Sequence, residues 1–449
     1  RNLMSRLTRR EFLCTSASLT AGILLTACAP VAPAPQGQTQ GGGNAPAAAK
    51  VSLLLWDGFG EDFANFNKII EGFQAANPTI EIKHEAQANM RDIIRTALDA
   101  DAGPDVLYYD TGPGFAGVLA RAGLLMPLDD AYAQYNWTDR VLPIAKERTT
   151  FDGKTYGIGN EVETIGVFYN KKIFEAHSLS EPKTHDEFLA LCEKLKGANQ
   201  TPIAFGDQPK WPAMHTFGVF AGNIAGHEKV AQAISAKLPW TDEDFVRSIQ
   251  IPLVDMVKAG YYNKDVNAVS YDDANALFYA GQAAMNITGS WMVGNYTNPD
   301  TMKDPVGFFF YPALDNKPAN PPAGLGSGYF ISKKTKHPEE ALKLLDYIFS
   351  KDAAKVWLEG MSMIPPIQLN VGDYKISELL SFVLQQLQKN ANTMSYNIDV
   401  LTPDNFNTAM FDGFQEVIGG TRTPADQAAA MEKAMQEAKA GGKVMDITK

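Results

Sequence analysis

The chain has 449 residues, of which 45% are apolar and 20% charged, a globular composition with enough length for two or three domains. Its 40 basic and 51 acidic residues give a formal net charge of −11, which argues against a surface for nucleic acid or an anionic membrane. Only three cysteines occur, and two of them, Cys14 and Cys28, lie in an N-terminal segment with other expected roles, so no disulfide framework is expected.

The N-terminal residues have the pattern of an export signal. Residues 8–13 read TRREFL, a twin-arginine pattern, and residues 14–25 form a weakly apolar stretch that is too short and too polar to span a membrane. The stretch ends in LTAC at 25–28, which resembles a bacterial lipobox, in which the cysteine thiol receives a lipid. We therefore predict a twin-arginine lipoprotein signal peptide over residues 1–27 and lipidation at Cys28.

A tether is predicted to follow the lipidated cysteine. Residues 29–49 carry no charge and consist mainly of Ala, Pro, Gly and Gln, so they cannot nucleate a core. Residues 28–49 are expected to be disordered and to hold the folded body on the order of 25 Å from its lipid.

From residue 51 the pattern alternates strand and helix. Strands are predicted over 51–56, 80–84 and 105–109, with helices between them, and this repeated unit is typical of a doubly wound α/β sheet. The same alternation returns in the middle of the chain, with strands over 165–169, 203–205, 283–287 and 306–310, which indicates a second α/β lobe. A strand over 329–332 and a mostly helical C-terminal part complete the pattern.

Several segments resemble a known family when they are taken together. They are FQAANPTIEI at 73–82, GPDVLYYD at 103–110, LARAGLLMPLDD at 119–130, FDGKTYGIGNEVETIGVFYNKKIFE at 151–175, GQAAMNITGSW at 281–291 and SGYFISKKTKHPEEALKLLDYI at 327–348. In this order and spacing they resemble the extracellular solute-binding proteins of ABC importers, in the sugar-binding group that includes maltose-binding protein. The resemblance covers essentially residues 50–440.

The resemblance implies a two-lobed periplasmic-binding-protein fold of class α/β. Its lobes are discontinuous in sequence and close by a hinge motion on a ligand held in the cleft between them. We expect lobe one over residues 50–157 and 313–350, and lobe two over 158–312 and 351–449. The chain should cross between the lobes near 156–161, 310–314 and 349–352.

Candidate ligand-binding residues follow from position and chemistry. In α/β sheets the ligand crevice lies at the carboxyl ends of the strands, and a sugar needs carboxylates and amides for its hydroxyls and flat aromatic faces for its C–H groups. Glu161 matches a position at which the family places a glutamate on the ligand. The candidates are Trp56, Asp57, Asp110, Thr111, Asn160, Glu161, Trp211, Trp291, Gly326 and Ser327.

Other roles for these residues stay open at this point. The tryptophans could pack in the core, and Asp110 could cap a turn or helix. Asp57, Glu61 and Glu163 could be solvated, and 324–328 could be a plain tight turn. Trp211 is expected in a loop over residues 206–212. The remaining tryptophans, Trp137, Trp240 and Trp357, are expected in the core.

Signals for catalysis are poor. GKT at 153–155 lacks the glycine of a phosphate-binding loop, because Arg148 stands at that position, and the histidines form no metal-ligand spacing. Cys192 falls on the apolar stripe of its helix and is expected in the core. We expect no enzyme, no cofactor and no metal.

The leading hypothesis is a lipid-anchored receptor outside the bacterial cell membrane. It would act as a monomer, capture a sugar or related polyol and deliver it to the permease subunits of an ABC transporter, without nucleic acid and with the lipid as its one membrane contact. Two alternatives remain: an exported carbohydrate-active hydrolase that uses paired carboxylates such as Asp110 and Glu161, and a binder of a phosphorylated polyol such as glycerol 3-phosphate. The second would need Arg or Lys in the cleft, where Lys210 and Arg121 stand near candidate loops.

Overall fold

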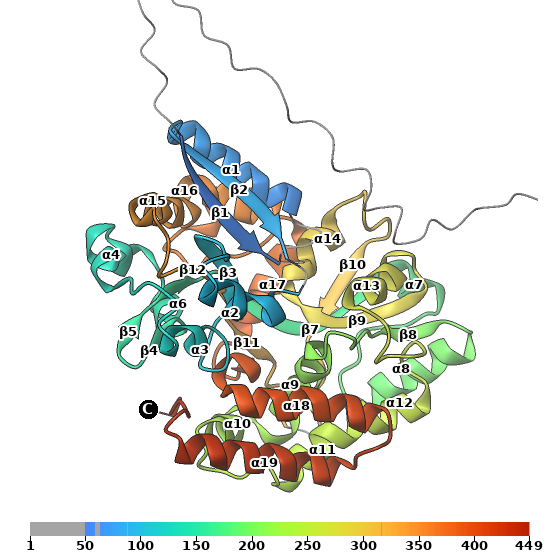
Figure 1. The fold of residues 1–449 in the computed structure, drawn as a ribbon. Helices are drawn as coiled ribbons and strands as arrows, with labels where there is room; N and C mark the ends of the chain where they lie inside the picture. Colours follow the sequence, from blue (N-terminus) through green and yellow to red (C-terminus); the bar gives the residue numbers. More distant parts are fainter. Residues whose placement is uncertain (1–49, 59–62, 88, 316, 449) are drawn as a thin grey trace, which may run out of the picture. The chain divides into compact units, whose positions relative to one another are not determined.

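The computed structural model describes residues 50–58, 63–87, 89–315 and 317–448. The predicted signal peptide, Cys28 and all of the predicted tether lie outside these described residues. From residue 50 onward the chain builds two α/β lobes, each on its own sheet (Figure 1).

The first sheet joins strands from three separate parts of the chain. Its order is β2 (Ile80–Ala86), β1 (Val51–Asp57), β3 (Val106–Asp110), β12 (Ser327–Ile331) and β6 (Gly157–Gly159). The β1, β2 and β3 strands are parallel, whereas β12 runs antiparallel to both β3 and β6. The described helices and small strands of this lobe are α1 (Phe63–Ala76), α2 (Met90–Asp99), α3 (Ala116–Arg121), α4 (Asp129–Gln134), α5 (Trp137–Arg140), α6 (Pro143–Glu147), β4 (Thr150–Phe151), β5 (Lys154–Thr155), α15 (Pro338–Ile348) and α16 (Lys351–Lys355).

The second sheet is mixed. Its order is β13 (Ser395–Tyr396), β11 (Pro322–Gly324), β7 (Glu163–Asn170), β9 (Ala283–Gly289) and β8 (Thr201–Ala204), and β10 (Val306–Phe309) also pairs with β7. Its described helices are α7 (Lys171–Ala176), α8 (His185–Gly197), α9 (Trp211–Ala225), α10 (His227–Ile234), α11 (Glu243–Gln250), α12 (Met256–Ala259), α13 (Tyr271–Tyr279), α14 (Val293–Thr297), α17 (Glu378–Lys389), α18 (Asp404–Ile418) and α19 (Pro424–Ala440). Figure 1 shows the C-terminal α18 and α19 beside α11, far away in sequence.

Strand pairing shows where the chain passes between the sheets. The first passage lies between β6 and β7, within the expected 156–161 region and the residues just after it. The second lies between β11 and β12, later than the expected 310–314, because β11 still pairs with β7 of the second sheet. The third also follows later than 349–352, because Trp357 and Met361 pack in the core of the first lobe.

The predicted strands and most predicted helices are confirmed. Helix α8 begins with a Thr184 cap, whose side chain accepts a hydrogen bond from the Glu187 N–H. Cys192, Trp137, Trp240 and Trp357 are all buried, as expected. One expectation is wrong: the loop predicted through residues 206–212 ends at Trp211, which begins helix α9.

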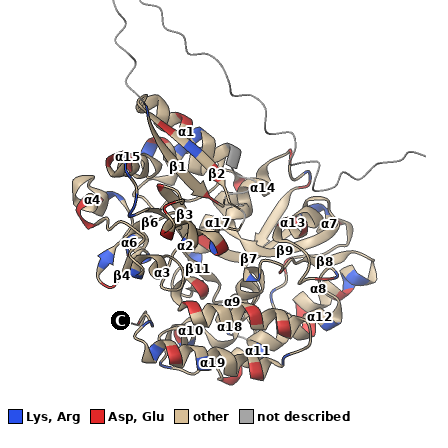
Figure 2. Ribbon diagram, viewed as in Figure 1, with Lys and Arg blue, Asp and Glu red and all other residues tan. Residues whose placement is uncertain are grey.

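Charged residues are spread over the helices of both lobes. Figure 2 shows acidic and basic segments interspersed, and in this view no side of the molecule carries charges of one sign alone. Among the described residues, no helix has both the length and the apolar character needed to cross a membrane.

Candidate functional site

Five of the candidate residues meet where three strands of the first sheet end. Ser327 pairs with Asp110 in register, since β12 runs antiparallel to β3. The Asn160 N–H donates to the Ser327 carbonyl oxygen at 2.8 Å, and the Thr111 N–H donates to the Gly326 carbonyl oxygen at 2.9 Å. The carboxyl end of β3 is therefore joined to the two segments that connect the lobes, as expected for a cleft at the strand ends.

Arg91 occupies the centre of this edge. Its Nε and Nη2 atoms donate to the two oxygens of Asp110 at 2.8 and 2.9 Å, a bidentate pair. Its guanidinium lies over the rings of Phe115 and Phe411, 4.8 and 5.8 Å from their centroids. Phe411 belongs to α18, so Arg91 connects the first lobe to the helices of the second.

Two buried carboxyl groups of the second lobe face this pair. Asp399, just after β13, has an oxygen 3.9 Å from Arg91 Nη2. Glu163, the first residue of β7, accepts hydrogen bonds from the Asn397 amide and from the Gly326 N–H. Burial raises the pKa of Glu163 to about 8, with the Asp399 and Asp110 charges adding to the shift. Burial likewise raises the pKa of Asp399 to about 7, against the lowering effect of Arg91.

The adjoining residues supply further polar groups. Asn160 is 1% exposed, and neither atom of its side-chain amide has a hydrogen-bond partner among the described residues. Glu161 is buried beside Tyr108, whose hydroxyl hydrogen-bonds with Ser327. Buried amides without partners are rare in folded proteins, so the Asn160 amide is an unusual feature of this edge of the sheet.

An aromatic group from three elements of the second lobe lies on the other side. The ring of Trp211 is 4.5 Å from that of Tyr271 and 6.2 Å from that of Trp291. Trp291 Nε1 donates to the Tyr271 hydroxyl at 2.9 Å, which fixes the orientation of both rings. His215 packs between the two tryptophans, and burial, together with the Arg91 charge, lowers its pKa to about 3, so it is neutral.

Strand register brings this aromatic group to the carboxyl cluster. The pairing of Ile165 with Gly289 continues to a hydrogen bond from the Thr164 N–H to the Ser290 hydroxyl, at 3.2 Å. Glu163 and Trp291 are the next residues of the two segments. The aromatic group and the carboxyl cluster thus adjoin at the junction of the two lobes: Trp291 follows the strand that pairs with β7, and Arg91, which is bound to Asp110, is close enough to His215 to lower its pKa.

Three candidates are engaged in internal contacts. Trp56 is 9% exposed and donates from Nε1 to Glu85 at 2.9 Å. Asp57 is fully buried and pairs with His84. The Thr111 hydroxyl donates to the Leu325 carbonyl oxygen at 2.8 Å. These contacts support the strand ends that carry the site.

Sequence reasoning did not select Arg91, Tyr271, Asn397 and Asp399, and it treated Glu163 as solvated. Arg91 stands in an amphipathic helix, where arginine is the usual solvent-facing residue. Asn397 and Asp399 follow a strand of only two residues, which leaves no alternation to mark it. Glu163 stands just after a crossover and just before the strand predicted over 165–169. This position was the sequence signal that could have marked it as a candidate site residue.

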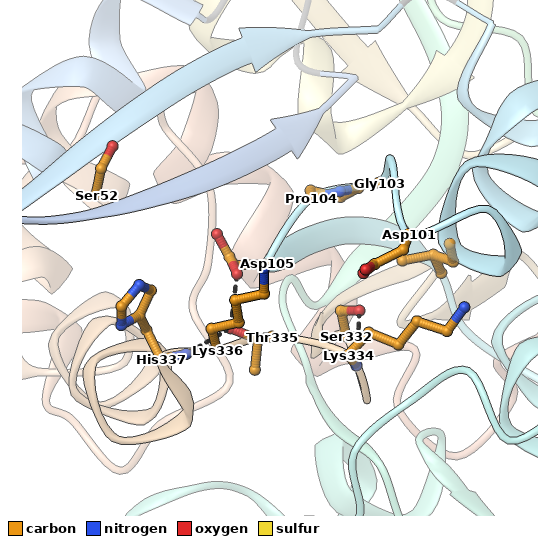
Figure 3. A pocket seen from close by; sticks show the side chains of 11 residues that line it. Ser52, Asp101, Gly103, Pro104, Asp105, Ser332, Lys334, Thr335, Lys336 and His337 are labelled. Atoms are coloured by element: carbon orange, nitrogen blue, oxygen red, sulfur yellow. Dashed lines mark hydrogen bonds between the residues drawn. The ribbon is translucent and has the colours of Figure 1, made fainter.

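A separate hollow lies at the other end of the first sheet. Figure 3 shows Asp105, Lys334 and Thr335 among its lining residues, next to the amino end of β3. Asp105 accepts hydrogen bonds there from the Leu54 N–H and the Thr335 hydroxyl, and Lys334 donates to the Asp99 carbonyl oxygen. These polar groups of the hollow are hydrogen-bonded within the protein. In contrast, amide atoms at the carboxyl ends of the strands have no hydrogen-bond partner among the described residues.

Comparisons with known proteins point to one group. A family model described as "Bacterial extracellular solute-binding protein" matches residues 57–355. An uncharacterized ABC transporter extracellular-binding protein of Pyrococcus horikoshii is 28% identical over 323 residues, which cover 69% of this chain and 70% of that protein. A multiple sugar-binding protein of Streptococcus mutans is 25% identical over 324 residues, which cover 69% and 74%.

Solved structures show the same architecture. A chitin oligosaccharide binding protein superposes with a TM-score of 0.78 at 26% identity, covering 88% of this chain and all of the other. The maltose/maltodextrin-binding domain of Bdellovibrio bacteriovorus, bound to maltotriose, gives a TM-score of 0.71 at 21% identity and covers 87% and 100%. The expected α/β periplasmic-binding-protein fold is confirmed.

Proposed function

Because the chain belongs to the bacterial extracellular solute-binding protein family, whose members bind and do not catalyse, we propose that it is the substrate-binding protein of an ABC importer. Its ligand is a mono- or oligosaccharide or a related polyol, which it delivers to the permease. The names of several relatives support the sugar class, among them the multiple sugar-binding protein and the chitin oligosaccharide binding protein.

One observation carries the proposal: an aromatic group of one lobe adjoins, through His215 and Arg91, the Asp110 carboxylate of the other. Trp211 and Trp291 offer flat faces for the C–H groups of a pyranose, and Asp110 and Asn160 offer acceptors and donors for its hydroxyls. Since these groups come from different lobes, a ligand that contacts both favours the closed form.

The rival phosphorylated ligand has less support. Its two candidate cations are engaged on the outside of the lobes, where Lys210 pairs with Asp412 at 2.6 Å and Arg121 pairs with Asp152 at 3.1 Å. Arg91 is held by both oxygens of Asp110. A phosphate would therefore have to compete with carboxylates for each of these cations.

Lobe movement requires hinges, and strand pairing supports their placement at 160–162 and 325–326, where the chain leaves one sheet for the other. The third connection lies between Met361 and the start of α17. Lobe one then comprises the first sheet with α15 and α16, and lobe two the second sheet with the C-terminal helices.

The test of ligand class is a panel of mono- and oligosaccharides, sugar alcohols and glycerol 3-phosphate, measured by thermal shift and calorimetry with product analysis. We expect one-to-one binding by a sugar class and an unchanged ligand after incubation. Selective binding of glycerol 3-phosphate, or no binding by any sugar, would contradict the proposal.

We also propose export by the twin-arginine route and a lipid anchor on Cys28. The support is the order of the sequence features: the arginine pair at 9–10, the apolar stretch, LTAC at 25–28 and the uncharged tether. Labelling with a radioactive fatty acid should mark the wild-type protein in a bacterial host, and Cys28→Ser should remove the label. Labelling that persists in the variant would contradict the anchor site.

A further inference from the structure

Two carboxyl groups at the lobe junction lack a cation of their own. Among the described residues, no Lys, Arg or His nitrogen lies within 4 Å of the Glu163 carboxylate, and Arg91 approaches Asp399 only to 3.9 Å. Arg91 is already engaged by both oxygens of Asp110 and by the rings of Phe115 and Phe411. Arg91 is thus shared by Asp110 and Asp399, and Glu163 has no cation beside it among the described residues.

This shortage has an energetic consequence. A buried carboxylate is stable only when it is paired, and otherwise it takes up a proton. Burial raises the pKa of Glu163 to about 8 and that of Asp399 to about 7, so both groups exchange protons near neutral pH. A cation that entered the junction would return them to their charged form and would be held by them.

The same junction contains hydrogen-bond acceptors without donors. The Asn397 amide donates to Glu163, but its own oxygen has no partner among the described residues, and Asn397 is 2% exposed. The amide oxygen of Asn160 likewise has no hydrogen-bond partner among the described residues. Two amide oxygens beside two carboxyl groups call for a ligand rich in donors, and an ammonium group supplies three.

The aromatic side of the junction fits such a ligand. The faces of Trp211, Trp291 and Tyr271 stabilise a positive charge as well as the C–H face of a sugar ring. His215 between the tryptophans is uncharged and does not repel a cation. Lys210, at the start of this group, is held by Asp412.

We propose that the preferred ligand is a saccharide with a free amine, that is, an amino sugar or an oligosaccharide containing one, whose ammonium group binds between Glu163 and Asp399 while its ring lies on the tryptophans. The inference rests on the proposed function and specifies its ligand class.

The test compares sugars that differ only in an amine or a hydroxyl group at one carbon. Suitable pairs are glucosamine with glucose, galactosamine with galactose, and β-1,4-linked tetrasaccharides of glucosamine with those of glucose, measured by calorimetry on the purified full chain near neutral pH. In at least one pair we expect the amine to bind at least about tenfold more tightly than its hydroxyl counterpart. Its affinity should rise between about pH 6 and pH 7.5, as Asp399 ionises and Glu163 begins to ionise.

Two variants assign the effect to the site. Asp399→Asn keeps the acceptor for the Val400 N–H, and Glu163→Gln keeps the acceptor for Asn397, so both retain the local hydrogen bonds. Each should reduce the preference for the amine at least about fivefold. Asp152→Asn, which neutralises an exposed carboxylate paired with Arg121, should leave it unchanged.

The outcomes separate this proposal from the proposed function. Equal or tighter binding of the hydroxyl sugars, or a preference that survives both variants, overturns the amine proposal and leaves a sugar-binding protein. Failure of every sugar in both series overturns both.

Discussion

Arg91 shows how one side chain joins the two lobes. Its planar guanidinium binds Asp110 with two hydrogen bonds and lies between Phe115 and Phe411, and a lysine ammonium can reproduce neither contact. We expect Arg91→Lys to weaken ligand binding at least about tenfold in calorimetry, although the charge is kept. The matched control is Arg121→Lys at the surface pair with Asp152, which should change affinity less than about twofold. Equal effects of the two substitutions would contradict the role given to Arg91.

Glu163 should make the stability of the unliganded protein depend on pH. Its pKa in the folded state, about 8, is above that of an exposed glutamate, so between these values the folded state holds a proton that the unfolded state has released. The contribution of Glu163 to stability is then fully present below the pKa of an exposed glutamate and falls as pH rises towards 8, by up to about 1.4 kcal/mol per pH unit. Denaturant unfolding between about pH 5 and pH 8 should show a steeper decline in wild type than in Glu163→Gln. Parallel curves would refute the assignment.

The predictable part of the site consists of residues at strand ends. Asp110 follows the apolar run of β3, and the carboxyl end of such a strand is where α/β sheets bind ligands. Arg91 and Asp399 were not predictable in this way, because their role depends on the approach of two lobes that are distant in sequence. The internal bonds of Trp56 and Asp57 were equally hidden, since Glu85 and His84 come from the neighbouring strand.

The loop after β3 permits the close approach of the lobes. Gly112 has a φ of +85°, and a Cβ atom there would lie 1.9 Å from the Val400 carbonyl oxygen, in the segment that carries Asp399. We expect Gly112→Ala to push these segments apart and to weaken ligand binding at least about tenfold in calorimetry.

A second glycine provides the control for this substitution. Gly123 has a φ of +70°, but a Cβ atom there would meet nothing within 4 Å. Gly123→Ala therefore carries the same left-handed strain, of order 1 kcal/mol, without the clash. It should lower stability and leave affinity unchanged. If both variants lost affinity alike, backbone strain and not lobe contact would be the cause.

At the level of elements, periodicity identified the strands better than the buried helices. The β1 strand is a short apolar run followed by a helix of clear period, and both were predicted. Helix α9 was missed because nearly all its sides are buried, which leaves no polar face to reveal a period of 3.6 residues. Its first residue, Trp211, stays a predicted ligand contact, whereas the loop predicted around it is wrong.

For the whole molecule, the proposed function makes binding and closure one equilibrium. The aromatic group belongs to the second sheet and its helices, and Asp110 belongs to the first sheet, so a ligand gains its full affinity only when the lobes meet. Small-angle scattering should therefore show a smaller radius of gyration with a bound sugar than without it.

A substitution that removes contact on one side should uncouple the two events. Trp211→Ala removes a ring from the second lobe and leaves Asp110 with Arg91 intact, so the sugar can still contact the first lobe but gains less by closure. At ligand concentrations that saturate this variant, we expect the radius of gyration to stay near its unliganded value. Full contraction of Trp211→Ala would show that the first lobe alone drives closure, because a ligand shifts an equilibrium only through its different affinity for the two states.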